Sequence, residues 1–238
     1  MIFHYNQNIS FSYVDEHGDV TPGAYIDLFQ DAADLHTQAV VSPVYQAQSH
    51  RVWILSYWHI LFDRPCHFHD NVKISTWSAG TKGMFAHRNY TIEQEDGTVC
   101  VRALSYWFLY DVVRKRPVRI QDEDVQWYEP SPALEWGQEN RKIALSDTMT
   151  PQERVQILHY MIDNNGHVNN GWYIKIACEY LNPQKRIREL RVEYCNAAHF
   201  GDVFYPTVEE THQKALIALN NASGKPYAIL EAIFDQGS

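Results

Sequence analysis

The sequence has no apolar run of the roughly 20 residues that a membrane-spanning helix needs. Its first residues lack the basic segment and apolar stretch of a secretory signal peptide. Only 4 of 238 residues are cysteine, and no two have the Cys-x-x-Cys spacing. This pattern predicts reduced thiols in a cytoplasmic protein. Basic residues are outnumbered, 20 against 29 acidic, and the net charge of -9 argues against nucleic-acid binding.

Apolar and aromatic residues are plentiful. Hydrophobic residues make up 45% of the chain, which is enough to build a core and argues against disorder. The 7 Trp, 15 Tyr and 10 Phe favour the pleated surface of a large β-sheet. A chain of 238 residues is long for one compact domain but comfortable for two small ones.

A segment near the start of the chain recurs 148 positions later. DEHGDVTPGAYI, residues 15–26, resembles DNNGHVNNGWYI, residues 163–174, and six of the twelve positions are identical. Further along, residues 66–72 resemble residues 198–203 at an offset of 132. We infer that one structural unit is duplicated. Only the second copy has a histidine at its fifth position, His167, where the first has Asp19, which suggests that one half performs chemistry and the other a different task.

Each copy leads into a predicted helix. Thr21 is a good N-cap and Pro22 suits the first helical position, while the second helix should start near Asn169 or Asn170. The apolar faces of the two helices are related by the same shift of 148 positions. They comprise Tyr25, Leu28, Phe29, Ala32 and Ala33 in the first helix, and Tyr173, Ile176, Ala177, Tyr180 and Leu181 in the second.

Strand-like segments follow each helix. They cover residues 52–62, 71–78, 87–95 and 99–110 in the first half, and 187–195, 202–210, 213–220 and 226–234 in the second. A helix packed on a curved antiparallel sheet would bury both apolar faces, so the fold class is α+β. We predict an N-terminal domain at 1–125, a linker at 126–140, within the acidic, proline-containing stretch 121–140, and a C-terminal domain at 141–238.

The polar residues Asp163, Asn165 and His167 alternate along the loop that precedes the second helix, so their side chains can converge on one site. Unpaired backbone N–H groups and the positive end of the helix dipole lie beside them. This arrangement favours an oxyanion formed during acyl transfer, with Asn169, Asn170 and Gly171 at the helix N-terminus. No Gly-x-Ser-x-Gly elbow is present, so direct attack by water is expected.

Less specific interpretations of these features remain open. The same Asn- and Gly-rich segment also suits a turn that only caps a helix. Cys195 as a nucleophile is a minor alternative, because nothing near it in the sequence would lower the pKa of its thiol. His67 and His69 beside Cys66 lack a further cluster at metal-ligand spacing, so we expect no metal site and no cofactor.

The segment Asp-x-Asn-x-His-Val-Asn-Asn at residues 163–170 resembles the catalytic signature of the fatty acyl-ACP thioesterases of plants and bacteria. The resemblance extends over most of the chain. Other matching positions are Trp53, Asp63-Arg64, Thr76-Trp77, Lys82-Gly83-Met84, Arg88, and Ala103 to Trp107. The resemblance implies a tandem, or double, hotdog fold. In this fold the first hotdog holds the acyl chain and the second holds the catalytic residues.

The chain departs from this pattern at one position. Plant members have a catalytic Glu on the strand after the second helix, and the matching residue here is Ala197. Glu193 and Cys195 share its alternation on a strand and are possible auxiliary residues. Asp163 or His167 acting directly as the base is a further alternative. We assign Asn165 and the helix N-terminus to the carbonyl oxygen, His167 to proton transfer or water, and Asp163 to the orientation of its neighbours.

Two further sets of residues bear on substrate binding. Trp53, Met84, Phe85 and Trp107 suit an acyl tunnel, although any one of them also suits a plain core. Arg114, Lys115, Arg116 and Arg119 form the densest basic run, which could dock an acidic carrier protein or be a solvated strand end. A second candidate docking run comprises Lys185, Arg186, Arg188 and Arg191.

We predict a cytoplasmic hydrolase that releases free fatty acid from acyl-ACP in fatty acid biosynthesis, as a monomer that is a pseudo-dimer or as a homodimer. Three alternatives remain: an acyl-CoA thioesterase, a hotdog dehydratase, and a non-catalytic acyl-carrier-binding protein, which Ala197 would favour.

Overall fold

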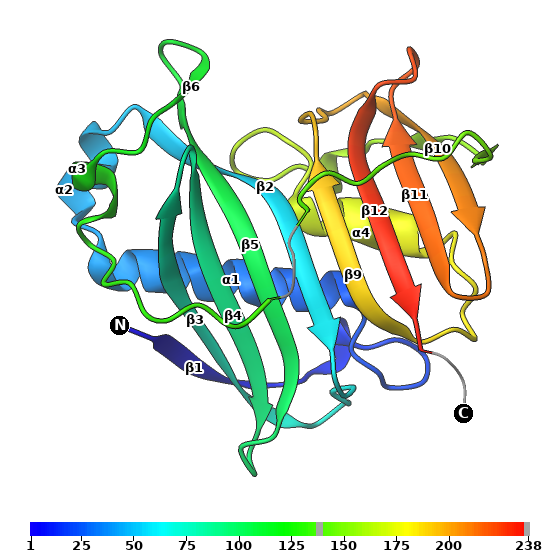
Figure 1. Ribbon diagram of the computed structural model, residues 1–238, viewed down its shortest axis with the longest axis horizontal. Helices are drawn as coiled ribbons and strands as arrows, with labels where there is room; N and C mark the ends of the chain where they lie inside the picture. Colours follow the sequence, from blue (N-terminus) through cyan, green and yellow to red (C-terminus); the bar gives the residue numbers. More distant parts are fainter. Residues whose placement is uncertain (137–139, 236–238) are drawn as a thin grey trace.

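The computed structural model describes residues 1–136 and 140–235 (Figure 1). Its first half contains β1 (Phe3–Asn8), a 3-10 turn (Phe11–Tyr13), α1 (Pro22–Val40), α2 (Pro43–Gln48), β2 (Arg51–Phe62), β3 (Asn71–Lys82), β4 (Phe85–Gln94), β5 (Val99–Asp111), β6 (Arg116–Val118) and α3 (Asp122–Val125). The second half contains β7 (Thr150–Pro151), β8 (Val155–Gln156), a 3-10 turn (His159–Met161), α4 (Asn170–Cys178), β9 (Ile187–Tyr194), β10 (Val203–Glu210), β11 (Lys214–Asn220) and β12 (Pro226–Phe234).

The two predicted helix starts are confirmed. The Thr21 hydroxyl accepts a hydrogen bond from the Ala24 N–H at 3.2 Å, and the Asn169 side chain accepts one from the Gly171 N–H at 2.9 Å. Both caps satisfy N–H groups that the first turn leaves unpaired. The predicted core face of α1 is buried throughout. In α4 the prediction holds for the first turns only, because the helix ends at Cys178 and Tyr180 and Leu181 pack on the core from beyond it.

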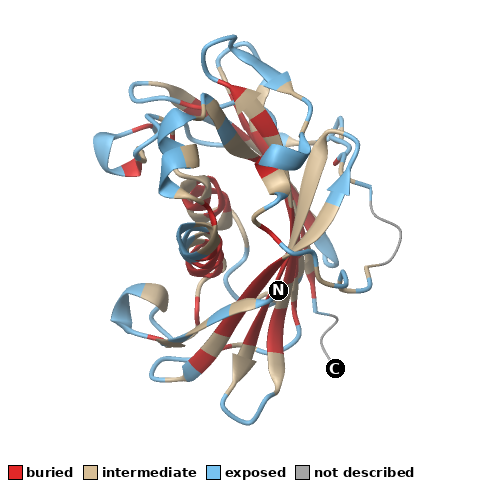
Figure 2. Ribbon diagram, turned by 90° about the vertical axis from the view of Figure 1, so that its left-hand side faces the viewer, coloured by how far each residue is buried: buried red, intermediate tan, exposed pale blue. Residues whose placement is uncertain are grey.

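A single antiparallel sheet joins the two halves. The strand order is β1-β3-β4-β5-β2-β9-β12-β11-β10-β7, with β6 paired to β5 and β8 to β10. Helices α1 and α4 lie side by side on one face of this sheet, and the strands beside them contain many buried residues (Figure 2). The site loop that precedes α4 is therefore held between a helix from each half and the sheet.

The duplication is present in the three-dimensional structure. At the centre of the sheet, His59 of β2 pairs with Arg191 of β9, and 191 − 59 is the offset of 132 found in the sequence. The Tyr25 hydroxyl accepts a hydrogen bond from the Cys66 N–H at 3.0 Å, and the Tyr173 hydroxyl accepts one from the Ala198 N–H at the same distance. A local twofold axis therefore passes between β2 and β9 and relates the two halves.

One strand is longer than predicted. The sequence pattern ends the strand at Ser78, whereas β3 continues to Lys82 after a register irregularity between Ser78 and Thr81. Gly80 lies there with φ +93°, a conformation that a residue with a side chain rarely adopts. The irregularity interrupts the alternation of side chains, so periodicity alone could not extend the strand past it.

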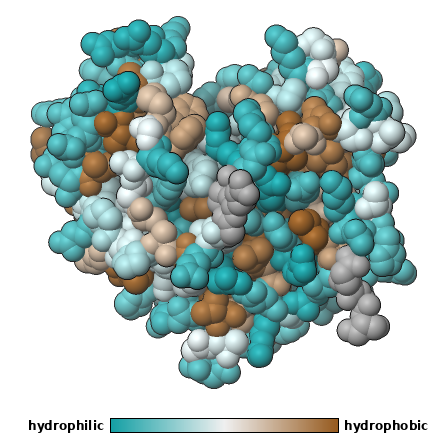
Figure 3. Space-filling view, in the orientation of Figure 1, coloured by the Kyte–Doolittle hydropathy of each residue, from teal (hydrophilic) through white to brown (hydrophobic). Residues whose placement is uncertain are grey.

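The predicted linker runs along the face of the sheet opposite the helices. The Trp77 indole N–H donates to the Pro132 carbonyl at 2.9 Å, and Leu134 N–H donates to the Asn89 side chain at 2.8 Å. Residues 137–139 of the linker and 236–238 of the predicted C-terminal domain lie outside the described residues. Hydrophobic and hydrophilic residues alternate over this outer face (Figure 3). Among the described residues, no helix is long and apolar enough to cross a membrane.

Candidate active site

The loop before α4 is organised around Asp163. Its Oδ1 accepts hydrogen bonds from the backbone N–H groups of Asn165 at 2.8 Å and His167 at 3.4 Å. The Asp163 N–H donates to the His167 carbonyl at 2.8 Å, which closes the loop. Gly166 has φ +77°, so the tight turn requires a glycine here. This carboxylate therefore fixes the backbone that presents the Asn165 and His167 side chains.

The first copy has the same loop with different side chains. Asp15 Oδ1 accepts from the backbone N–H groups of His17 at 2.9 Å and Asp19 at 3.0 Å, and Gly18 has φ +83°. The aspartate and the glycine are thus common to both loops and serve their shape. Asn165 and His167 stand where the first loop has His17 and Asp19.

The N-terminus of α4 is clamped by residues from both halves. The Asn170 side-chain amide donates to Gln30 Oε1 of α1 at 3.1 Å, and the Gln30 amide donates to Asn169 Oδ1 at 3.4 Å. The Tyr194 hydroxyl donates to the Asn170 carbonyl at 2.9 Å. Sequence reasoning did not identify Gln30 or Tyr194, because neither belongs to a motif and their roles arise from contacts across the two halves.

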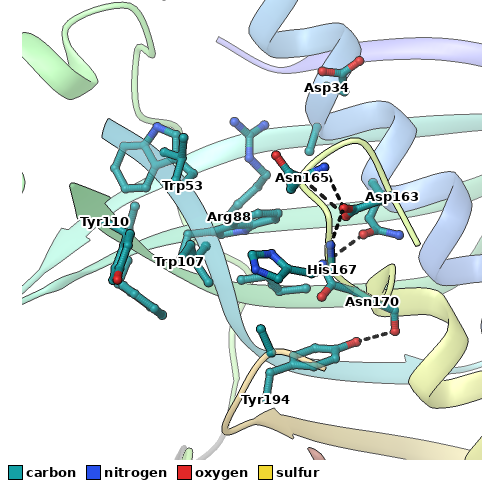
Figure 4. Close-up of a pocket in the computed structure, with 18 of the residues that line it drawn as sticks. Asp34, Trp53, Arg88, Trp107, Tyr110, Asp163, Asn165, His167, Asn170 and Tyr194 are labelled. Carbon is teal, nitrogen blue, oxygen red and sulfur yellow. Dashed lines mark hydrogen bonds between the residues drawn. The ribbon is translucent and has the colours of Figure 1, made fainter. Parts of the chain in front are cut away.

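A cavity of about 860 Å³ connects this loop to the first half (Figure 4). Asp163, Asn165 and His167 lie at one side of it, and Trp53 and Trp107 face them from the strands of the first half. Residues of α1, β2, β3, β4 and β5 complete its wall, among them Ala33, Thr37, Leu55, Ser78, Ala86 and Tyr110. A cavity of this size with an aromatic wall and a few polar groups suits a largely apolar ligand.

A polar network forms part of the cavity wall at Thr37, Arg88 and Tyr128. Arg88 Nη1 lies 2.9 Å from His36 Nδ1, and its guanidinium lies 5.2 Å from the Tyr128 ring centroid. The Tyr128 and Thr37 hydroxyls are 2.8 Å apart. Burial and the neighbouring Arg88 charge lower the pKa of His36 to about 4, so its ring is neutral and accepts from Arg88. Of these residues, only Arg88 stands out in the sequence.

Two of the four predicted acyl-pocket residues lie elsewhere. Trp53 and Trp107 line the cavity, but Met84 and Phe85 are not part of its described wall. Met84 belongs to the turn between β3 and β4, and the Phe85 ring lies under the Arg141 guanidinium at 4.4 Å. Because strand side chains alternate, the cavity is lined instead by Ala86, next to Phe85.

Glu193 does not reach the cavity. Its carboxylate accepts a hydrogen bond from the Ile143 N–H at 3.1 Å and pairs with Lys142, both in the segment that covers the outer face of the sheet. Strand β9 ends at Tyr194, so the alternation that relates residue 193 to residue 197 does not continue that far. The prediction that Glu193 and Ala197 lie on the same side of a strand is therefore wrong. Ala197 itself lines the cavity.

Cys195 lines the cavity but has an unreactive thiol. Burial, followed by the Glu193 charge, raises the pKa of Cys195 to about 11. A thiol at this value is protonated near neutrality and is a poor nucleophile. Among the described residues, no group of three or more His, Cys, Asp or Glu side chains could hold a metal ion, and His67 instead pairs with Asp19.

The predicted basic run lies at the rim of the cavity. Arg114, Lys115, Arg116 and Arg119 are exposed on and after the turn between β5 and β6, and Val112 and Pro117 of the same hairpin line the cavity. Arg114 lies 3.6 Å from Asp111; within the described chain the other three make no ion pair. In the second basic run, by contrast, Lys185, Arg186 and Arg191 are paired with Glu210, Asp235 and Glu231.

Known proteins resemble this chain in sequence and in fold. The sequence profile of the acyl-ACP thioesterase N-terminal domain matches residues 1–128. An acyl-ACP thioesterase from Bacteroides thetaiotaomicron superposes with a TM-score of 0.88 at 20% identity, over 98% of both chains. A 12:0-ACP thioesterase from Umbellularia californica superposes with a TM-score of 0.87 at 16% identity, over 98% of this chain and 97% of that one. No curated protein sequence matches the chain. The predicted double hotdog fold is confirmed.

Proposed function

The chain belongs to the acyl-ACP thioesterase family and hydrolyses the thioester of acyl-ACP, and from this premise we propose that Asp163, Asn165, His167 and the N-terminus of α4 carry out the reaction. The observation that carries this proposal is the opening of the Asp163 loop into the 860 Å³ cavity, opposite Trp53 and Trp107. A thioester carbonyl can reach the loop while its acyl chain occupies the apolar part of the cavity.

Each group has a defined role in this mechanism. The Asn165 amide and the positive end of the α4 dipole stabilise the carbonyl oxygen as it gains negative charge. His167 takes a proton from the attacking water, so that the new C–O bond forms without free hydroxide. The tetrahedral intermediate then loses the carrier's sulfur as a thiolate, which is protonated to the thiol. Asp163 holds the loop in the geometry that these steps need.

His167 is the proposed base because the cavity wall has no carboxylate at position 197, where the resemblance implies a Glu and Ala197 stands instead. Asp163 is already engaged by two backbone N–H groups. The Cys195 thiol is protonated. Among the polar side chains of the second half that line the cavity, His167 is therefore best suited to accept a proton near neutral pH.

The two halves divide the work in this proposal. Residues 1–125 supply most of the acyl-chain wall, residues 126–140 connect the halves, and residues 141–238 supply the reacting groups. The polar network of Arg88, His36 and Tyr128 lies near Thr37, about two helical turns along α1 from Gln30, which contacts the N-terminus of α4. The acyl chain would extend from the catalytic loop between α1 and the strands that line the cavity.

The acyl carrier protein would dock at the basic hairpin. Arg114, Lys115, Arg116 and Arg119 are exposed beside the cavity, and three of them have no acidic partner in the described chain. An acidic carrier would be attracted to such a patch although the whole chain carries a charge of -9. We further propose a cytoplasmic location, which four free cysteines favour. The fused halves allow the chain to act as a monomer or to pair as a homodimer.

The decisive experiment measures free fatty acid release from acyl-ACPs of graded chain length, each matched by the same acyl group on CoA. Release from the ACP substrates with a low KM would support the proposal and identify the preferred chain length. Equal efficiency with acyl-CoA would argue against carrier docking at the basic hairpin. Tight binding of acyl-ACP without any release would contradict hydrolysis at this site.

A further inference from the structure

The catalytic histidine has a second histidine beside it. The rings of His167 and His199 lie 4.8 Å apart between centroids, with an interplanar angle of 74°. His199 lies in the turn between β9 and β10, next to the segment that lines the cavity at Asn196 and Ala197. Its side chain is 58% exposed, so its ring is in contact with solvent.

The first half demonstrates how close these two positions can come. Asp19 is equivalent to His167 at the offset of 148, and His67 is equivalent to His199 at the offset of 132. Asp19 Oδ1 lies 2.7 Å from His67 Nδ1, which is a direct hydrogen bond. Side chains at these two positions are therefore neighbours in both halves, and in the second half both are imidazoles whose ring centroids lie 4.8 Å apart.

The backbone fixes His199 in place. Its N–H donates to Asp202 Oδ2 at 2.9 Å, and the Asp202 N–H donates to the His199 carbonyl at 3.1 Å. The Val168 N–H donates to the Ala198 carbonyl at 2.9 Å and so ties this turn to the loop of His167. Corresponding bonds hold His67 in the first half, from the His67 N–H to Asp70 and from the Val20 N–H to the Cys66 carbonyl.

One carboxylate lies near the His199 ring. His199 Nδ1 lies 3.8 Å from Asp202 Oδ2, and within the described chain no other acidic side chain lies within 4 Å of its ring nitrogens. Asp202 also faces Tyr227, whose pKa is raised by burial and by this carboxylate.

We propose that His199 is a positioning residue and proton relay for His167, an inference that rests on the proposed hydrolysis at this site. His167 removes a proton from water as the oxygen bonds to the thioester carbon, and His199 accepts that proton and passes it to solvent. The C–S bond breaks, and the departing thiolate takes a proton from solvent. One water and one thioester thus give one fatty acid and one thiol. The relay supplies the proton transfer that Ala197 cannot.

The experiment compares four variants of the full chain with the wild type: His199→Ala, His167→Ala, the double variant, and His67→Ala as the matched control. Steady-state hydrolysis of one acyl-ACP gives kcat and KM, with and without added imidazole. We expect His199→Ala to lower kcat about tenfold at unchanged KM, a smaller loss than the ~10²-fold or more that follows removal of the direct base. Imidazole should restore it, because the vacated position is open to solvent.

The double variant should be no slower than His167→Ala, since residues that act as one unit do not add their effects. His67→Ala should keep the wild-type kcat, and added imidazole should not change it. The relay would be overturned by an unchanged kcat in His199→Ala or by a loss of kcat that imidazole does not restore. Additive losses of kcat in the double variant would overturn it as well. An inactive wild type would overturn hydrolysis and the relay together. Failure of the relay alone would leave the wild type active and His167→Ala impaired.

Discussion

Asp27 of α1 and Lys175 of α4 form an ion pair, with Oδ2 and Nζ 2.5 Å apart. They are equivalent residues that directly follow the two copies of the repeated segment, since 27 + 148 = 175. Lys175 packs over Gly23, and Asp27 packs against Gly171, which are again equivalent positions. The local twofold relationship therefore passes between two helices held in close contact by small residues and one pair of opposite charges.

Exchanging Asp27 and Lys175 for each other should leave the stability nearly unchanged, whereas reversing only one of the two charges should lower it. Lys175→Asp places two carboxylates together and is expected to lower the free energy of unfolding by about 1 kcal/mol, because the pair is partly exposed. The double variant Asp27→Lys/Lys175→Asp should recover most of this loss. Urea unfolding at low and high salt measures both effects. Equal stabilities of the single and double variants would contradict a direct interaction.

Removal of the proposed base should abolish most turnover. His167→Ala is expected to lower kcat for acyl-ACP by about 10²-fold or more, because water loses its proton acceptor. Asp19→Ala is the matched control, since Asp19 occupies the equivalent loop position in the first half. Steady-state assays of both variants decide the matter. Full activity in His167→Ala would remove this residue from the mechanism.

Reversal of the basic hairpin should weaken carrier binding. Changing Arg114, Lys115 and Arg116 to Glu is expected to raise KM for acyl-ACP about tenfold at low salt, and less at high salt, because exposed charges are screened. KM for the same acyl group on CoA serves as the control for an intact cavity. An unchanged KM for acyl-ACP would place docking on another surface.

Acid should destabilise the folded chain through His36. The folded state lowers the pKa of His36 from 6.5 to about 4, so between these values the unfolded chain binds more protons. Stability is therefore complete above pH 6.5 and falls as the pH decreases toward 4, by on the order of 3 kcal/mol at most. Unfolding free energies across this range should decline less in His36→Gln. Parallel pH profiles of the two proteins would refute the assignment.

Glu193 should matter for stability and not for chemistry. Glu193→Ala removes the acceptor of the buried Ile143 N–H and the partner of Lys142, so we expect a loss of about 1–3 kcal/mol in unfolding free energy. At temperatures where the variant stays folded, kcat should match the wild type. A large fall in kcat without loss of stability would return Glu193 to the list of candidate catalytic residues.

The sequence by itself determined the features that depend on local chemistry. Thr21 and Asn169 cap helices through bonds that span two or three residues, and Gly166 permits the turn of the catalytic loop. Asp163 also acts within four residues of itself. Because such interactions are encoded in adjacent residues, the repeat, both helix starts and the central site loop could be identified from the sequence.

Only the tertiary structure decided which side chains meet across long separations. The clamp between Gln30 and Asn170 and the contact between Arg88 and His36 join residues 140 and 52 positions apart, and no local pattern marks them. The side of the sheet on which Glu193 lies also had to be observed, because the strand ends before residue 197. Side-chain alternation is set by the backbone of one strand, whereas the wall of a cavity is set by the packing of several elements against one another.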